Sequence, residues 1–202
     1  MLIGVDFDNT IVCYDHLMHS FAVERGWIPQ DASPTKQAIR EHLRSSGNEE
    51  RWTELQGFVY GQLILQATPF PGVLEFFTKC RSQRVETVII SHRTPLPFRG
   101  PQVNLHHAAR GWLKAFGFFD TDGIGLHEEC VSFEETREQK LSRIKSAGCS
   151  CFIDDLPEFL DQPMFPAGVQ RILFDPHAGH LGRLDFGRVH SWMEISELFL
   201  SD

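Results

Sequence analysis

The chain has 202 residues, of which 42% are hydrophobic and 23% charged, the composition of an ordinary globular protein with room for one domain and a small satellite. Its 27 acidic residues outnumber its 19 Lys and Arg residues, and the formal net charge of -8 argues against a surface that grips nucleic acid polymers. A small anionic substrate held in a local positive pocket remains compatible with this charge.

The cysteines and the apolar segments indicate in which cellular compartment we expect the protein. The five cysteines are odd in number and show neither a disulfide framework nor a CxxC zinc spacing. No stretch approaches the ~18 apolar residues of a membrane span. The chain opens at Leu2 on an expected strand rather than on a signal peptide. We therefore expect a cytoplasmic protein with reduced thiols and no membrane partner.

Four short apolar segments, each followed by polar residues, predict buried β-strands. They span residues 2–5, 85–90, 149–153 and 169–174. Residues 123–127 are a possible further strand. Because helical segments separate the strands, we expect an α/β fold with a Rossmann-like parallel sheet sandwiched by helices. Ligands bind at the carboxyl ends of such strands, which is where the polar residues fall.

Residues 15–67 show no strand pattern and predict an all-helical insertion after the first strand. Leu17 and Phe21 share one helix face, Ser33-Pro34 marks a second helix start, and Asn48 could cap a third helix. The core resumes near residue 68, and helical spacing of apolar residues predicts a helix over 105–116. We therefore divide the chain into an α/β core of residues 1–14 and 68–202 and a helical insertion of residues 15–67.

Acidic side chains gather at two of the predicted strand ends. Asp6 and Asp8 follow the first strand, and Asp154 and Asp155 follow the strand over residues 149–153. Clustered carboxylates repel each other unless their pKa values rise or a cation neutralises them. Mg²⁺ is a hard cation that commonly uses one or two carboxylates together with phosphate and water. The pattern therefore predicts a magnesium site.

Two further residues suit a phosphate group. Ser91 offers a hydroxyl donor and Lys140 a point charge. Lys140 competes for this role with Arg137, Arg143 and Lys145 of the same charged stretch, but Lys140 opens the helix that leads to the Asp154 strand. Together with the carboxylates, these residues provide the nucleophile, proton donor and positive charge that phosphoryl transfer requires.

In this order and context, the segments resemble the haloacid dehalogenase (HAD) superfamily. The resemblance rests on Asp-Phe-Asp-Asn-Thr at residues 6–10, Ser91 after an apolar strand, Lys140 at the start of a helix, and Ile-Asp-Asp at residues 153–155. It spans most of the chain. The helical insertion is similar to the family's cap domain, which closes over small substrates.

The resemblance implies a Mg²⁺-dependent phosphatase that works through an aspartyl-phosphate. Asp6 would attack phosphorus, and Asp8 would protonate the leaving oxygen and later activate water. Ser91 and Lys140 would hold the phosphoryl oxygens. Family dehalogenases lack an acid at the position of Asp8, which favours the phosphatase branch. The metal ligands would be Asp6, the backbone carbonyl of Asp8, Asp154 and, in support, Asp155.

The expected substrate is a small phosphorylated metabolite of the nucleotide or sugar phosphate class. His92 and Arg93, next to Ser91, are candidate substrate contacts. One alternative is a phosphotransferase or phosphomutase that uses the same intermediate. A second alternative, from another class, is a non-catalytic metal-binding regulatory module, against which the intact set of acidic residues and Lys140 argues.

Overall fold

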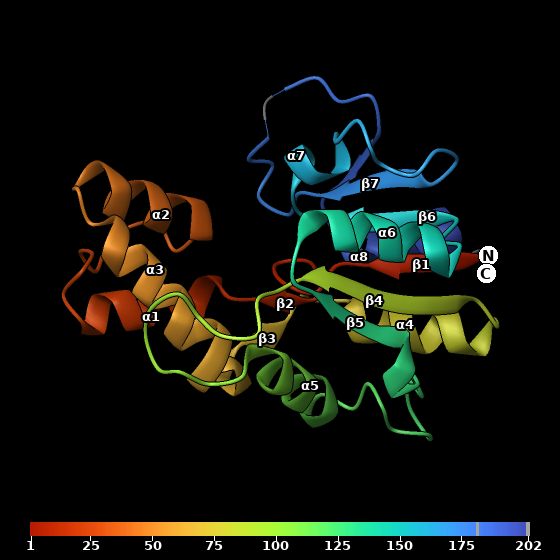
Figure 1. The fold of residues 1–202 in the computed structure, drawn as a ribbon, viewed down its shortest axis with the longest axis horizontal. Helices are drawn as coiled ribbons and strands as arrows, with labels where there is room; N and C mark the ends of the chain where they lie inside the picture. The colour runs from red at the N-terminus through yellow and green to blue at the C-terminus, as the bar shows by residue number, and fades with distance from the viewer. Residues whose placement is uncertain (181, 201–202) are drawn as a thin grey trace. The chain divides into compact units, whose positions relative to one another are not determined.

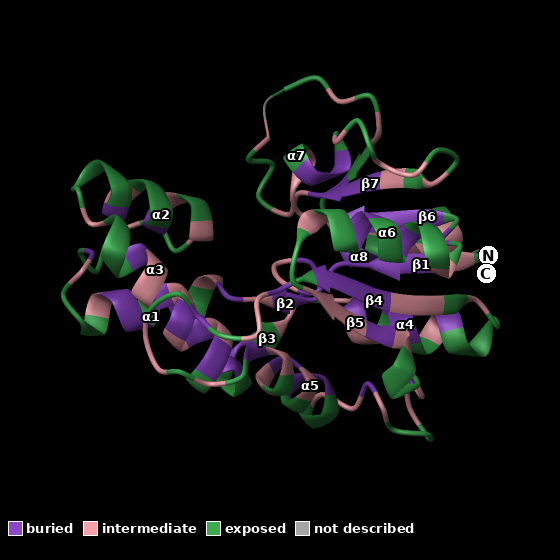
Figure 2. Ribbon diagram, in the orientation of Figure 1, coloured by how far each residue is buried: buried purple, intermediate pink, exposed green. Residues whose placement is uncertain are grey.

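The computed structural model describes residues 1–180 and 182–200 and divides into two compact units (Figure 1). Unit 1 comprises Met1–Val12, Pro69–Arg93 and the described part of Gly117–Asp202. Unit 2 comprises Cys13–Thr68 and Thr94–Phe116. Each unit buries its own set of apolar side chains (Figure 2).

Unit 1 is built on a six-stranded parallel sheet. The strands stand in the order β5 (Val131–Glu134), β4 (Glu86–His92), β1 (Leu2–Val5), β6 (Cys151–Asp154), β7 (Gln170–Phe174) and β8 (Gly187–Val189). The chain extends the sheet from β1 through β4 to β5, then returns to β6 on the other side of β1. The strand order therefore reverses at β1, and in open α/β sheets ligands bind beyond the carboxyl ends of the strands at this point.

Helices cover both faces of this sheet (Figure 1). α6 (Arg137–Ala147) and α7 (Pro157–Leu160) pack on one face, against Ile90, Phe152 and Leu173 of the strands. α4 (Val73–Ser82) and α8 (Trp192–Phe199) pack on the other face, where Phe174 lies 5.8 Å from the Trp192 ring. Successive strand residues such as Leu173 and Phe174 thus serve opposite layers. The predicted α/β sandwich is confirmed.

One predicted strand is wrong. Residues 123–127 form turns and irregular backbone, and Gly125 has φ = 64°, a left-handed conformation outside the extended region of a regular strand. The strand at this edge of the sheet is β5, which begins at Val131 and pairs with β4 from Ile89 onward. The short strand β8 at the other edge was not predicted, because its sequence, Gly-Arg-Val, contains no apolar run. β1, β4, β6 and β7 lie within two residues of their predicted ends.

Unit 2 is helical. Its helices are α1 (Asp15–Glu24), α2 (Lys36–Ser45), α3 (Glu49–Gly57) with a π-helical turn η1 (Phe58–Gln62) and a 3₁₀ turn η2 (Ile64–Gln66), and α5 (Leu105–Ala115). The N-cap of α2 is Thr35 rather than Ser33, because the Thr35 hydroxyl accepts the backbone N–H of Ala38. Within residues 1–180 and 182–200, no helix combines the length and apolar character that crossing a membrane requires.

The boundaries of unit 2 differ from the predicted insertion of residues 15–67. Residues 94–116, which we expected in the core, group with the helices of unit 2. The buried indole of Trp112 donates to the carbonyl of Ala67 at 2.9 Å. Gly57 allows the loop after residue 93 to approach closely, since a Cβ there would lie 1.9 Å from the Arg99 carbonyl oxygen.

The chain therefore passes between the units four times. Two crossings lie in the short paired strands β2 (Val12–Cys13) and β3 (Thr68–Pro69). The other two follow Arg93 and Phe116. An insertion of residues 15–67 alone would have crossed only twice.

Candidate active site

Asp6 stands directly beyond the central strand of unit 1. Its backbone N–H donates to the carbonyl of Ile153 at 2.9 Å, so the ladder between β1 and β6 continues one residue past Val5. The Asp6 side chain is buried, with 4% of the residue exposed. A carboxylate at this depth needs compensating partners.

The turn after Asp6 places a second carboxylate at the same edge. The carbonyl of Phe7 accepts the backbone N–H groups of Ile11 and Val12, both at 3.1 Å, which folds the chain back after Asp8. Asn9 adopts φ = 59°, a left-handed conformation that asparagine tolerates better than most residues. The Asp8 carboxylate accepts two hydrogen bonds from Nη1 of Arg93, at 2.5 and 2.7 Å.

Lys140 supplies the positive charge next to Asp6. It lies in the first turn of α6, whose start is fixed by a capping box between Thr136 and Gln139. Its Nζ donates to Oδ1 of Asp6 and to Oδ2 of Asp154, both at 2.6 Å. The buried ammonium also lies 4.2 Å from the ring centroid of Phe159. Lys140 therefore joins the carboxylates at the ends of β1 and β6.

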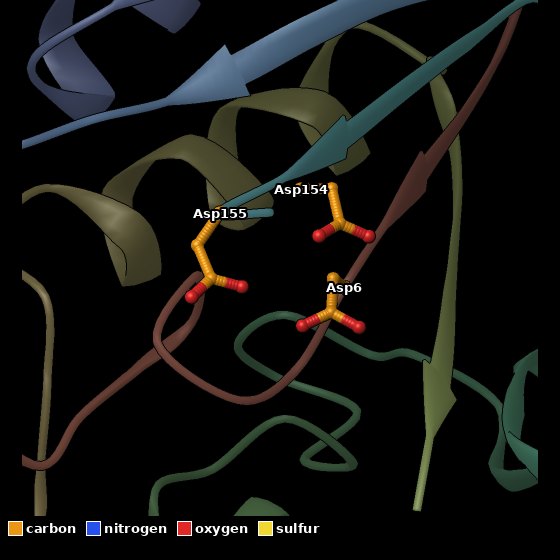
Figure 3. A group of neighbouring side chains, drawn as sticks. All are labelled: Asp6, Asp154 and Asp155. Atoms are coloured by element: carbon orange, nitrogen blue, oxygen red, sulfur yellow. The ribbon is translucent and has the colours of Figure 1, made fainter. Parts of the chain in front are cut away.

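Asp6, Asp154 and Asp155 form an acidic cluster whose ligand oxygens lie within 4.8 Å of one another. Figure 3 shows the three carboxylates turned toward a common region from the ends of β1 and β6. The other oxygen of Asp154 accepts the N–H of Leu156 at 2.9 Å, which fixes the orientation of that carboxylate. Three carboxylates at this spacing fit a hard divalent cation such as Mg²⁺.

The pKa values of two buried groups reflect this crowding. Burial raises the pKa of Asp6 to about 7, the negative charges of Asp154 and Asp8 add to the effect, and Lys140 opposes it. Burial disfavours the ammonium of Lys140, yet the carboxylates of Asp154 and Asp6 outweigh it and raise the pKa of Lys140 above its ordinary value. The ammonium stays charged at neutral pH, while Asp6 is poised between its two forms.

Ser91 and His92 occupy the carboxyl end of β4, next to β1 in the sheet. Ser91 is buried and His92 is exposed. The His92 Nε2 lies 3.1 Å from the carbonyl oxygen of Glu135. Although much of His92 is exposed, partial desolvation of its imidazole lowers the pKa of this group. The hydrogen bond at the Glu135 carbonyl opposes this effect, and the charges of Lys140 and Arg137 lower the pKa further.

The structure brings most of the predicted site residues into direct contact, although in two separate groups. Asp6, Asp154 and Lys140 form one group, with Asp155 in the acidic cluster, and Asp8 pairs with Arg93 in the other. Among the described residues, the acidic cluster does not include the Asp8 carboxylate. Sequence reasoning missed Thr136, although Thr-x-x-Gln before Lys140 is a recognisable capping signal.

Comparisons with known proteins connect this geometry to a fold. No protein-family model matches the chain, and no curated protein sequence matches it. A predicted phosphoglycolate phosphatase from Haemophilus somnus shares 15% identity at a TM-score of 0.57, over 98% of this chain and 96% of that one. A HAD hydrolase from Bacillus subtilis, solved with magnesium, shares 12% at a TM-score of 0.52, over 99% and 98% of the two chains. A dehalogenase solved with an intermediate complex shares 14% at 0.56, over 100% and 97%. These likenesses establish the fold.

Proposed function

We propose that this chain, whose fold is that of the HAD-superfamily hydrolases, is a magnesium-dependent phosphatase for a small phosphorylated metabolite of the nucleotide or sugar phosphate class. The observation that carries the proposal is the bridge that Lys140 makes between Asp6 and Asp154 at the central strand ends. A buried carboxylate beside a buried ammonium and a cation-binding cluster suits attack on a phosphate ester, because the charges that oppose the approach of two anions are neutralised.

The acidic cluster would hold the metal. Asp6, Asp154 and Asp155 supply carboxylate oxygens, and the backbone carbonyl of Asp8 is our fourth proposed ligand. A bound Mg²⁺ supplies charge neutralisation for the phosphoryl oxygens and for the cluster itself. The similarity to a magnesium-bound HAD hydrolase supports this choice of ion.

In the first step, an Asp6 carboxylate oxygen attacks phosphorus, and the bond between phosphorus and the leaving oxygen breaks. The Asp8 carboxyl gives its proton to that oxygen, and the alcohol departs. In the second step, Asp8 takes a proton from water, the water oxygen attacks phosphorus, and the bond to Asp6 breaks to release phosphate. Lys140 offsets negative charge at Asp6 in both steps, and the Ser91 hydroxyl would donate to a phosphoryl oxygen.

Asp8 decides between the chemistries found on this fold. Similar structures include proteins named as dehalogenases as well as a predicted phosphatase, so the fold leaves the reaction open. Displacement of a halide needs no proton donor, whereas an alkoxide leaving group does. A carboxylate two residues beyond the nucleophile, held in place by Arg93, supports phosphoester hydrolysis.

The test compares Asp6→Asn with Asp8→Asn, using an activated aryl phosphate labelled in the phosphoryl group and Mg²⁺. Asp6→Asn removes the nucleophile, so the denatured protein should carry no label. Asp8→Asn keeps the nucleophile but lacks the base for the second step, so labelled phosphoenzyme should accumulate. General acid–base catalysis typically contributes about 10²–10⁴-fold to the rate. We therefore expect turnover by Asp8→Asn to be lower than that of the wild-type protein by a factor in this range. Equal labelling of both variants would show that Asp6 is not the nucleophile.

A further inference from the structure

Arg93 forms an ion pair with Asp8, the proposed proton donor. Its Nη1 donates to both carboxylate oxygens of Asp8, at 2.5 and 2.7 Å. The side chain of Asp8 is 17% exposed, whereas that of Arg93 is 3% exposed. The solvent-facing partner of the pair is therefore the proposed acid, and the arginine lies beneath it.

The guanidinium is held from two further directions. Its central carbon lies 5.6 Å from the ring centroid of Phe7, and that ring packs edge-on against Phe133 of β5 at 5.6 Å. The backbone N–H of Arg93 donates to the carbonyl of Glu134 at 2.8 Å, which extends the β4–β5 pairing to this residue. An arginine fixed at its backbone, its ring contact and its charged end has little freedom to reorient.

We propose that Arg93 is a positioning residue that orients the Asp8 carboxyl, and that it does not bind the phosphoryl group of the substrate. The proposal rests on the proposed function, and it revises our expectation that Arg93 contacts substrate. A proton donor must point at the leaving oxygen to within a fraction of an ångström, and a buried cation that contacts both carboxylate oxygens restrains their tilt.

The two roles differ in what they predict for substrates. A positioning residue acts only through Asp8, so its loss should matter most where the leaving oxygen needs a proton. It should also slow hydrolysis of the aspartyl-phosphate, because the same Asp8 activates the water. A phosphoryl ligand would instead lower affinity for every phosphate ester and for inorganic phosphate alike.

The experiment measures Arg93→Gln and Arg93→Lys with one alkyl and one activated aryl phosphate, and measures the inhibition constant of inorganic phosphate. In Arg93→Gln, kcat/KM should fall about 10–10²-fold for the alkyl ester and clearly less for the aryl ester. Arg93→Lys should recover part of the loss. Affinity for inorganic phosphate should stay within about twofold of wild type. Labelled phosphoenzyme should accumulate in Arg93→Gln and not in wild type.

A double variant makes the test independent of any general weakening of the fold. Because Arg93 acts through Asp8, adding Arg93→Gln to Asp8→Asn should change alkyl ester turnover little further. The control is Arg143→Gln, which removes a half-exposed arginine that pairs with Glu134 at 2.7 Å, and which should leave the alkyl-to-aryl ratio unchanged.

Three results overturn the inference. They are an equal loss for both esters, a matching loss of inorganic phosphate affinity, and a multiplicative loss in the double variant. Failure of the proposed function is a different result, since wild-type protein with Mg²⁺ would then neither hydrolyse a phosphate ester nor carry label.

Discussion

At the scale of single residues, the main feature of the candidate active site is a net negative charge on buried side chains. Asp6 and Asp154 share one ammonium, that of Lys140, and all three residues are at most 4% exposed. One cation cannot fully neutralise two carboxylates, and Asp155 adds a third at the edge of the cluster. Burial is the largest cause of the raised pKa of Asp6; Lys140 opposes it, and the negative charges of Asp154 and Asp8 add to it. Both the burial and the surplus of negative charge favour a proton or a divalent cation at Asp6.

This competition predicts how Mg²⁺ binding depends on pH. In the metal-free protein the pKa of Asp6 is raised from 3.8 to about 7, so below pH 7 a proton occupies the carboxylate that the metal needs. Mg²⁺ affinity should therefore be nearly constant above pH 8. Well below pH 7 it should fall by about tenfold for each pH unit, because each bound Mg²⁺ displaces one proton from Asp6. Calorimetry at pH 6 in two buffers of different ionisation heat should detect release of about one proton.

The matched variant is Asp6→Asn, which removes the titrating group. It should bind Mg²⁺ more weakly and lose most of this pH dependence. An affinity in the wild-type protein that is the same at pH 6 and pH 8 would show that the metal does not displace a proton from Asp6.

At the scale of elements, the start of α6 determines where Lys140 lies. The Thr136 hydroxyl accepts the N–H of Gln139 at 3.2 Å, and the Gln139 side chain accepts the N–H of Thr136 at 3.0 Å. The N–H of Lys140 itself donates to the carbonyl of Thr136 at 3.0 Å. These bonds fix the backbone of the first turn up to Lys140, and the ammonium at the end of the side chain is then held by Asp6 and Asp154.

We therefore predict that removing either of two helix caps in unit 1 lowers stability to a similar degree, but that only one of the two changes lowers activity. Thr136→Ala and Ser191→Ala each remove a hydroxyl that accepts a backbone N–H, and each should cost about 1 kcal/mol of unfolding free energy. Only α6 carries a proposed catalytic residue in its first turn. A shift of about 1 Å can cost about 10²-fold in rate, and we expect Thr136→Ala to lose about threefold to tenfold in kcat/KM.

Ser191→Ala, at the start of α8, should keep wild-type kcat/KM despite an equal loss of stability. Denaturant unfolding and steady-state kinetics on the same preparations measure both quantities. If the two variants lost activity to the same degree, stability rather than the position of Lys140 would be the cause.

The success of sequence reasoning varied with the kind of element. Strands buried on both faces, such as β1 and β6, were predictable because they are continuous apolar runs that end in acids. Edge strands were not: β5 reads Val-Ser-Phe-Glu and shows intermediate burial after its first residue. The pairing of Arg93 with Asp8 was also hidden, since it joins positions 85 residues apart and depends on the adjacency of β1 and β4.

At the scale of the whole molecule, the division into units depends on contacts that no local pattern encodes. Residues 94–116 belong with the helical unit because Trp112 bonds Ala67, and because Gly57 and Gly61 present bare backbone to the loop before α5. From the sequence alone, these glycines are residues of low helix propensity, and nothing in the local pattern indicates that another segment packs against them. A shortened chain that lacks only residues 15–67 would leave the buried face of α5 without partners.

The proposed metal site lies wholly in unit 1, and this predicts a local response to Mg²⁺. All three carboxylates of the acidic cluster, together with Lys140, come from unit 1, while unit 2 has a separate core around Ile39, Leu43 and Leu55. A ligand that binds only the folded form stabilises it by about 2.7 kcal/mol at 100 times its dissociation constant.

Native-state hydrogen exchange followed by mass spectrometry should therefore show Mg²⁺ slowing exchange in peptides from residues 1–12, 69–93 and 117–200. Peptides from residues 13–68 and 94–116 should exchange at unchanged rates, because their opening does not require release of the metal. Asp6→Asn serves as the control and should show a much smaller difference in either unit. Equal slowing in both units of the wild-type protein would show that they open as one cooperative block, and that stability at the proposed metal site is shared by the whole chain.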